Sequence, residues 1–456
     1  MKVHRNRSVR RVRVTTDGHG LVSHAGVGLL SELADRSGLT HGLSRAMADC
    51  GIGWHTHDPG VVLAHLAVAI ADGADCLSDI AMIRAQDKLF GPVASRPTAW
   101  RVIDKIMSVE QRTIPVAVTA ARARVWAAAN VDLKLVTLDF DATLITAHSE
   151  KQDAAPTYKR GFGFHPFGVW CDETNELLAA VLRPGNAGAN NTDDHLELLD
   201  AAIAALPERF RRGHDVGDTP DLVEVGLLIR ADSAGASHGV VRAVLEANAD
   251  YSIGFQINGS VRDALLLIQE EQWRPAIETD GTRRPGAEIV ELTRFVDLSG
   301  WGRGCRLICR RERPHPGAQL SLFDAVDGWR HTAFITNTRG DAPTLELRHR
   351  GHARVEDRVR CWKATGMTNV PFDDYTRNQA WLTVTLIASN LIAWTQLVCL
   401  DGELARAEPK TLRHRLFHVA ARLSHTHRRH VLRIDATWPW RHHLAGAFTR
   451  LRTRLA

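Results

Sequence analysis

Residues 133–143 have the sequence LKLVTLDFDAT, and this stretch is the strongest indication of the fold. Its apolar and β-branched residues alternate with the others, a pattern that is typical of a β-strand. The alternation places Leu133, Leu135, Thr137, Asp139 and Asp141 on one side of the strand. Asp141 is therefore expected at the carboxyl end of a core strand, with Asp139 on the same face.

The elements predicted downstream of this strand follow an order that indicates an α/β core. They are strands at 165–172 and 177–185, a helix at 191–206, a strand at 223–235, a helix at 237–247 and a strand at 250–257. Together with the strand at 133–143, this gives the order of a ribonuclease-H-like fold: three strands, then a helix, a strand, a helix and a strand. The predicted fold class is therefore α/β, with a ribonuclease-H-like catalytic core.

The rest of the chain is arranged around that core. The expected regions are an all-α N-terminal DNA-binding or dimerisation region (1–130), the first part of the core (131–257), a β-rich insertion (258–345), the second part of the core (346–400) and a basic C-terminal tail (401–456). The second part of the core begins with a helix at 349–366, for which Gly366 is the expected stop. Two short helical segments around Ser37–Gly38 fit either a helix-turn-helix or ordinary antiparallel packing.

The composition is that of a globular protein, with 44% hydrophobic and 24% charged residues. The N-terminus, MKVHRNRSVRRVRV, lacks the apolar stretch of a secretory signal, which predicts a cytoplasmic, nucleoid-associated protein without a membrane partner. Residues 381–400 carry no charge, but six of them are polar, which favours a buried core helix over a membrane span. The seven scattered cysteines indicate reduced thiols, and Cys305 and Cys309 are expected to be strand residues.

Positive charge is concentrated at the two ends of the chain. Residues 409–456 contain eleven Lys or Arg and one acid, and a second basic cluster runs from Lys2 to Arg13. Basic ends on a near-neutral body indicate a polyanionic partner, most plausibly nucleic acid, although a solvated tail has the same composition. Apolar residues interleave with the charges of the tail and favour a docked, folded segment. They are Leu416, Phe417, Val419, Leu423, Trp438, Trp440 and Phe448.

Three acidic residues are predicted to meet at one edge of the core sheet. Asp141 ends the first strand, Asp232 ends the strand at 223–235, and Glu356 lies in the helix at 349–366. Two bare carboxylates about 4 Å apart repel by about 4 kcal/mol at an effective dielectric constant of 20. Divalent cations reverse that sign, and carboxylate oxygens are the ligands that Mg²⁺ and Mn²⁺ prefer. The arrangement therefore predicts a site for Mg²⁺ or Mn²⁺, with two ions, that acts on phosphodiesters.

The helix that carries Glu356 presents a polar stripe. At 100° per residue, His349, His352, Glu356 and Lys363 fall within a band about 60° wide. Apolar residues flank this band. Such a stripe is typical of a site face, although exposed helix surfaces often carry similar charges.

These residues resemble the motifs of the insertion-sequence DDE transposases, in the branch whose last motif is a Tyr-x₂-Arg-x₃-Glu-x₆-Lys helix. The matching stretches are Asp141-Ala142-Thr143, Arg230-Ala231-Asp232-Ser233, and Glu356 with Lys363. Further similar segments are GFGFHPFGVW (161–170), RPGN (183–186) and NQAWLTVTLIASNL (378–391), and the resemblance covers most of residues 20–400. The chain departs from the family at His349 and His352, which stand where the motif has Tyr and Arg.

The resemblance implies a DNA transposase that cuts transposon ends and joins them to target DNA. Asp141, Asp232 and Glu356 would be the catalytic and metal-binding residues, and Lys363, with His352 and His349, would contact DNA phosphates. The implied partners are the terminal inverted repeats and target DNA, bound by a homodimer or a larger synaptic assembly. The insertion would help to hold transposon-end DNA by stacking a flipped base on Trp273, Trp301 or Trp329. The alternative is that these tryptophans fill the small core of the insertion.

Two other functions fit part of the sequence. LDFDATLI also fits the opening motif of haloacid-dehalogenase-type phosphatases, in which Asp139 would be the nucleophile and Asp141 the acid–base. That class does not account for Glu356 or for the basic ends, and Asp139 could equally be an alternative first carboxylate. The two histidines in the third motif also fit an inactive transposase remnant or a basic DNA-binding factor.

Overall fold

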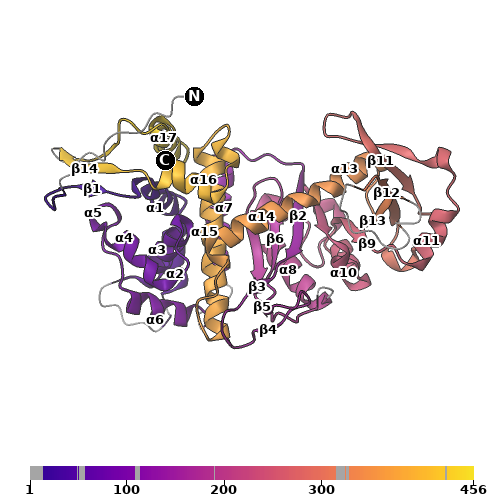
Figure 1. The fold of residues 1–456 in the computed structure, drawn as a ribbon, viewed down its shortest axis with the longest axis horizontal. Helices are drawn as coiled ribbons and strands as arrows, with labels where there is room; N and C mark the ends of the chain where they lie inside the picture. The colour runs from indigo at the N-terminus through magenta and orange to yellow at the C-terminus, as the bar shows by residue number, and fades with distance from the viewer. Residues whose placement is uncertain are drawn as a thin grey trace, which may run out of the picture.

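The computed structural model describes residues 14–48, 50, 57–107, 113–188, 191–314, 324, 328–426 and 429–456. The predicted basic cluster from Lys2 to Arg13 lies outside these residues. The molecule is elongated, with a helical end and a β-rich end on either side of a central sheet (Figure 1). The long helix α15 (Tyr375–Cys399) stands between the helical end and the sheet (Figure 1).

A nine-stranded sheet has the order β10-β11-β12-β13-β9-β8-β2-β6-β7. Its strands are β2 (Leu135–Ala142), β6 (Phe167–Cys171), β7 (Leu177–Val181), β8 (Gly226–Ala231), β9 (Asp250–Phe255), β10 (Arg274–Ile277), β11 (Arg283–Glu291), β12 (Arg306–Glu312) and β13 (Arg330–Thr336). β2, β8 and β9 are parallel, and the other neighbouring pairs are antiparallel. The strands predicted in the core are confirmed, and the chain has a mixed α/β fold with a large sheet.

A small second sheet lies beside the end of β2. It has the order β3-β5-β4 and consists of β3 (Ile145–Thr146), β4 (Ala155–Pro156) and β5 (Phe162–Phe164). The turn between β4 and β5 carries Tyr158, Lys159 and Arg160, all of them exposed. This basic turn therefore projects from the part of the sheet that follows Asp141.

The region expected as a β-rich insertion continues the central sheet. It opens with a helix, α11 (Gly259–Leu266), and its last strand, β13, pairs with β9. The pairing satisfies the backbone groups along the outer edge of β9, which would otherwise be a free sheet edge. Cys309 lies within β12 and Cys305 directly before it, and both are buried free thiols, as predicted.

Helices cover both faces of the sheet. On one face, Phe140 lines a small internal space together with side chains of α8 (Thr192–Ala204) and α10 (His238–Glu246). On the other face lie α13 (Ala342–Arg350) and α14 (Arg354–Trp362), joined by a single 3-10 turn at 351–353. The two helices follow one line across the sheet (Figure 1). The last turn ends at Gly366, whose φ of 82° is left-handed, so the predicted stop is confirmed.

The helical end is a bundle around α3 and α15. Its helices are α1 (Gly28–Arg36), α2 (Leu39–Ala46), α3 (Pro59–Asp72), α4 (Ala81–Arg84), α5 (Asp87–Phe90), α6 (Arg96–Ile106) and α7 (Thr113–Ala128). α1 and α2 turn at Gly38, whose φ is 79°. Because α2 packs against α3 and α7 and buries Leu39 and Leu43, this helix pair takes part in ordinary bundle packing.

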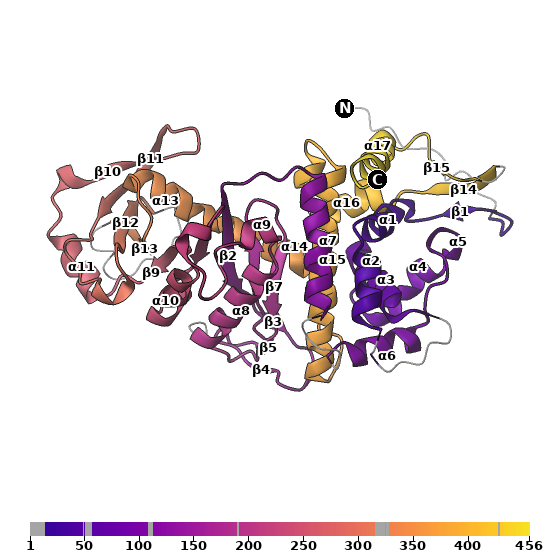
Figure 2. The same cartoon turned by 180° about the vertical axis from the view of Figure 1, so that it is seen from behind.

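The basic C-terminal segment is folded and docked on this bundle, as predicted (Figure 2). It contains α16 (Pro409–Leu412), β14 (Ala421–Thr426), β15 (Arg429–Ile434) and α17 (Arg441–Arg454). β14 pairs with β1 (Leu21–Val22), and α17 contacts α1 and α15. Leu416 and Phe417 are fully buried, so the apolar residues of the tail pack into the core.

By length and composition α15 could cross a membrane, with a mean hydropathy of 1.5, and 72% of that window is buried inside the protein. The bent pair Pro59–Asp72 and Leu77–Arg84 passes the same test together, at an angle of 102°. The Asn390 amide donates to the carbonyl of Leu177 in β7 and accepts from its N–H, both at 2.9 Å. α15 is therefore packed as a core helix against the sheet, as expected.

Candidate active site

Asp141 and Asp232 occupy equivalent places on neighbouring parallel strands. β2 and β8 pair with Asp139 beside Arg230 and Phe140 beside Ala231. The predicted carboxylates follow directly, Asp141 within β2 and Asp232 as the first residue after β8, and paired strands lie about 4.8 Å apart. Asp141 is half-buried and Asp232 is exposed, so this end of the sheet is open to solvent.

Glu356 reaches the same end of the sheet from α14. His352, one turn before Glu356, places its Nδ1 2.9 Å from Asp139 Oδ1. The negative charge of Glu356 acts on the carboxyl of Asp141, so this part of α14 lies near the end of β2. Glu356 is exposed at this position.

Asp232 and Glu356 are close enough to Asp141 for their charges to affect its ionisation. Burial raises the pKa of Asp141 to about 6, and the negative charges of Asp232 and Glu356 contribute to the increase. His352 and the N–H of Ala142 act in the opposite direction. In the part of the chain that the structure describes, no Arg, Lys or His forms an ion pair within 4.0 Å of any of these three carboxylates. The positive charges that act on Asp141, such as that of His352, therefore do so from beyond ion-pair distance.

The ligand atoms of the three acids do not form a compact cluster. Among the described residues, three ligand atoms lie within 4.8 Å of one another in two other clusters, His24–Asp72–His418 and Asp75–Cys76–Asp79. Asp141, Asp232 and Glu356 are not such a cluster, as expected of like charges that repel.

The raised pKa of Asp141 predicts a specific dependence of stability on pH. Because the folded protein holds this proton more tightly than the unfolded chain, stability should fall as pH rises through the folded pKa of about 6. Asp141→Asn removes the ionisable carboxyl group, so the stability of this variant should lack the fall with pH that Asp141 causes. Relative to the wild type, the variant should therefore gain about 2 kcal/mol of unfolding free energy between about pH 4 and pH 7. Urea unfolding of both proteins in EDTA measures this difference, and a difference that does not change with pH would contradict the raised pKa of Asp141.

Asp139, directly behind the three acids, is buried and fully paired. Arg230 donates to both of its oxygens at 2.7 Å, Arg358 donates at 3.1 Å and His352 lies at 2.9 Å. The side chain is completely excluded from solvent. A carboxylate held by two guanidinium groups and closed to solvent cannot attack a phosphate ester, so the phosphatase alternative does not fit. Asp139 is likewise unavailable as an alternative first carboxylate.

The same ion-pair network continues to Asp172, at the end of β6. Arg230 donates to Asp172 at 2.7 Å, and Arg354 and Arg358 of α14 donate to it as well. These arginines hold the pKa of Asp172 well below its usual range despite its burial. The network fastens α14 to β2, β6 and β8, and so fixes the height of Glu356 over the strand ends. Sequence reasoning missed Asp172, Arg354 and Arg358.

Lys363 lies beside the three acids at the end of α14. Its Nζ donates to the carbonyl of Leu144 at 2.9 Å. Burial and the nearby charge of Lys159 lower the pKa of Lys363, while Asp141 raises it. Lys363 and the exposed basic turn that carries Lys159 therefore face the same site, and the structure brings together the acids and the predicted phosphate-binding lysine.

His349 is not brought into this group. Its ring stacks on Phe334 of β13 at 4.3 Å, and its Nδ1 lies 3.0 Å from the Ser252 hydroxyl. Burial lowers its pKa to about 3, so the imidazole is neutral. His349 thus packs against β9 and β13 and not beside the acids, which does not favour the expected phosphate contact. His352 stays near the site but is bound to Asp139.

His195 of α8 is a neighbour of Asp232 that sequence reasoning missed. The charge of Asp232 acts on the His195 ring, although burial is the main effect and lowers the pKa of this imidazole. The ring packs edge-on against Phe167 at 4.6 Å, and its Nδ1 lies 2.8 Å from the carbonyl of Asn191. A neutral histidine thus supports the strand end that carries Asp232.

The three tryptophans proposed for base stacking have different environments. Trp301 packs edge-on against Phe255 and His238. The guanidinium of Arg311 lies over Trp273 at 4.2 Å and over Trp329 at 4.5 Å. Trp301 therefore belongs to the packing of the β-rich end, and one face of each of the other two rings is covered by arginine.

Comparison with known proteins gives a family and similar solved structures. Residues 4–455 match the family described as "Transposase DDE domain group 1". No curated protein matches the sequence. A solved synaptic complex of piggyBac transposase with hairpin DNA is similar over 84% of this chain and 80% of that chain, with a TM-score of 0.45 and 10% identity.

Proposed function

The chain belongs to the group 1 DDE transposases, and we propose that Asp141, Asp232 and Glu356 are the carboxylates with which it cuts and joins DNA. As a member of this family it is a DNA transposase, a metal-dependent DNA endonuclease and strand transferase. One observation supports the assignment of residues: the negative charges of Asp232, directly after β8, and of Glu356, in α14, act on the carboxyl of Asp141 at one end of the sheet.

We further propose that β2, β6, β7, β8 and β9 with α14 form a ribonuclease-H-like core. An antiparallel trio, β2, β6 and β7, is followed by β8 and β9, both parallel to β2. The first acid ends β2, the second follows β8, and the third comes from a helix across the sheet. This order supports the proposal. The strands β10–β13 would then be an addition that continues the sheet beyond β9.

The three carboxylates fit divalent cations by charge and by donor type. They offer only oxygen donors, which Mg²⁺ and Mn²⁺ prefer, and two of the three are exposed to solvent. The three carboxylates do not form a compact three-ligand cluster, and the arrangement that we propose is a pair of ions about 3.5–4 Å apart held between them. When bound, such ions would activate water or a 3′-hydroxyl and stabilise the leaving oxygen.

The other residues of the site position these carboxylates and the substrate. Asp139 and Arg230 hold β2 against β8 in the register that aligns Asp141 with Asp232. Lys363 stands where its ammonium group can leave the carbonyl of Leu144 and contact a DNA phosphate. The exposed turn with Lys159 and Arg160 supplies further positive charge on the path of the DNA strand.

The activity is tested by cleavage of DNA that carries the terminal repeats flanking the gene. Purified protein should nick these ends with Mg²⁺ or Mn²⁺ and should be inactive in EDTA. Protein that binds the ends but never cuts them with either ion would favour the inactive remnant or DNA-binding factor. The retention of all three acids, with Lys363 beside them, supports the active enzyme.

The basic C-terminal segment is proposed to bind the DNA backbone. Arg422 of β14 and Arg433 of β15 are cross-strand partners, and both are exposed. Like charges placed opposite each other are unfavourable unless an anion lies between or above them. A DNA phosphate bound between the two arginines would offset their repulsion. The tail would then supply the positively charged surface that binds the DNA backbone.

The double substitution Arg422→Gln/Arg433→Gln should weaken DNA binding and reduce its salt dependence. Each lost phosphate contact lowers the slope of log K against log salt by about 1, so the double variant should lose about 2. Fluorescence anisotropy over a series of salt concentrations measures the slope. Arg209→Gln, which changes an exposed arginine paired with Asp132, is the matched control. An unchanged slope in the double variant would exclude this pair from the interface.

A further inference from the structure

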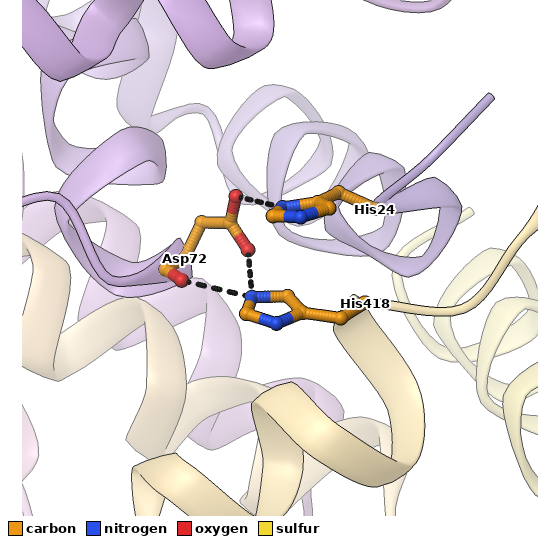
Figure 3. Close-up of side chains that lie close together, drawn as sticks. All are labelled: His24, Asp72 and His418. Carbon is orange, nitrogen blue, oxygen red and sulfur yellow. Dashed lines mark hydrogen bonds and ion pairs between the residues drawn. The ribbon is translucent and has the colours of Figure 1, made fainter.

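Three side chains from distant parts of the chain meet at the helical end of the molecule. None of them belongs to the acidic site on the central sheet. His24 precedes a short turn at 25–27, Asp72 is the last residue of α3, and His418 follows the turn at 413–417 (Figure 3). Figure 3 shows both imidazole rings directed at the carboxylate of Asp72. The start of the described chain, the bundle and the basic tail are joined at this point.

The three side chains have a compact geometry. His24 Nδ1 lies 2.7 Å from Asp72 Oδ2, and His418 Nε2 lies 2.8 Å from Asp72 Oδ1. The two rings are stacked, with centroids 4.0 Å apart and 20° between their planes. One ligand atom of each residue lies within 4.8 Å of the others. Two imidazole nitrogens and one carboxylate oxygen therefore converge on one small volume.

The backbone at His24 is held in an unusual conformation. Its φ of 44° and ψ of 38° are left-handed, which is uncommon outside glycine. Such a conformation persists where the surroundings determine it strongly, and it is frequent at ligand-binding positions. Here it turns the His24 ring onto the carboxylate.

The carboxylate of Asp72 is buried, with 1% of its side chain exposed, and carries a negative charge. Hydrogen bonds from both histidines lower the pKa of Asp72, although burial acts against them. The neighbouring Arg413 directs its guanidinium to the carbonyls of Ile70, Ala71 and Ala364. The oxygens of Asp72 are thus left to the two imidazoles.

We propose that His24, Asp72 and His418 bind a divalent transition-metal ion of the zinc class. Two imidazoles and a carboxylate are a common donor set for Zn²⁺, with ligand distances of about 2.0–2.2 Å, and the ion would take the place of the protons now shared with Asp72. The two nitrogens lie against different oxygens of Asp72, so an ion held by one of these oxygens would draw the second imidazole toward it, to the roughly 3.3 Å that separates ligands at tetrahedral angles. The side chains of His24 and His418 are 25% and 37% exposed, which leaves room for water as the fourth ligand.

The site is independent of the proposed cleavage chemistry and has a structural role. β1, two residues before His24, pairs with β14, three residues after His418. A bound ion would therefore link the first strand, α3 and the basic tail through one centre. Because binding favours the docked arrangement, the ion should raise the melting temperature of the protein, and a chelator should lower it.

The proposal is tested by counting zinc bound to the full chain. Wild type, His24→Gln and His418→Gln are dialysed against Zn²⁺ at neutral pH, and bound metal is measured by elemental analysis. Each variant should bind one equivalent less than the wild type. His414→Gln is the matched control, because His414 is exposed on the same turn, four residues before His418, and should keep the wild-type count. Zinc bound at the acidic site or at other histidines is common to all four proteins and cancels.

Two further measurements separate metal binding from loss of structure. Far-ultraviolet circular dichroism in EDTA should be the same for all four proteins, since both histidines are partly exposed. Cobalt bound by the wild type should give the visible absorption of a tetrahedral site, and this band should be absent from His24→Gln and His418→Gln. Equal zinc counts in the wild type and both variants would overturn the proposal and leave a purely hydrogen-bonded cluster.

Discussion

Asp232→Asn is expected to reduce cleavage of transposon ends by about a thousandfold or more, while binding of the same DNA stays within a factor of two or so. The amide keeps the shape of the side chain but removes the negative charge that would hold a divalent cation. Loss of several kcal/mol of transition-state stabilisation corresponds to that factor in rate. Because Asp232 is exposed and its Oδ1 caps only a short turn at Ala234 N, the fold should not change.

The companion variant Asp232→Cys distinguishes a metal ligand from a general polar contact. Sulfur binds Mg²⁺ poorly but accepts softer ions, so this variant should be inactive with Mg²⁺ and partly restored by Mn²⁺. Cleavage is measured with end-labelled DNA under single-turnover conditions, and binding is measured by anisotropy. Full activity of Asp232→Asn with Mg²⁺ would show that this acid is not part of the active site.

Arg230→Met is expected to lower the free energy of unfolding by about 3–5 kcal/mol, because it leaves a buried carboxylate without its main partner. Arg230 is 1% exposed and donates to both oxygens of Asp139, which is itself fully buried. Methionine fills much of the same volume, so the loss reports on charge and hydrogen bonding more than on packing. Urea unfolding at neutral pH measures the change.

Arg209→Met is the control for this substitution. Arg209 pairs with Asp132 at 2.6 Å, but both side chains are at least half exposed, and exposed pairs contribute little. Its substitution should change the unfolding free energy by less than about 1 kcal/mol. A similar small effect for Arg230→Met would mean that the buried network does not hold β2, β8 and α14 together.

The strands that carry the acids could be predicted from the sequence because local patterns determine them. The alternation at 133–143 and the turn residues after Trp170 and Ala231 are properties of neighbouring residues. Placement of Asp141 beside Asp232 then follows from parallel pairing of two such strands. The position of Glu356 depended on the resemblance to a family, because no local pattern states where a helix crosses a sheet.

The parts that the sequence did not predict depend on contacts between distant segments. The angular stripe on the helix grouped His349 with Glu356, but an angle does not show what stands opposite each turn. Seven residues of helix advance about 10 Å, so His349 lies over Ser252 while Glu356 lies over the strand ends. Asp172 and Arg358 meet for the same reason, through a helix placed across the sheet.

The extension of the sheet was also beyond sequence reasoning. Alternating runs predicted strands in residues 258–345, but pairing of β13 with β9 is decided by which sheet edge is free. The folded C-terminal segment, in contrast, could be predicted, because its apolar residues are too numerous for a solvated arm. Leu444, Ala447 and Leu451 are the buried face of α17.

The assignment of the three carboxylates is tested most directly by locating metal in a crystal of the protein with its terminal-repeat DNA and Mn²⁺. Anomalous scattering at the manganese edge should give peaks bound by Asp141, Asp232 and Glu356, beside the phosphate to be cut. Manganese held elsewhere in the complex, with these three side chains unliganded next to the DNA, would contradict the account.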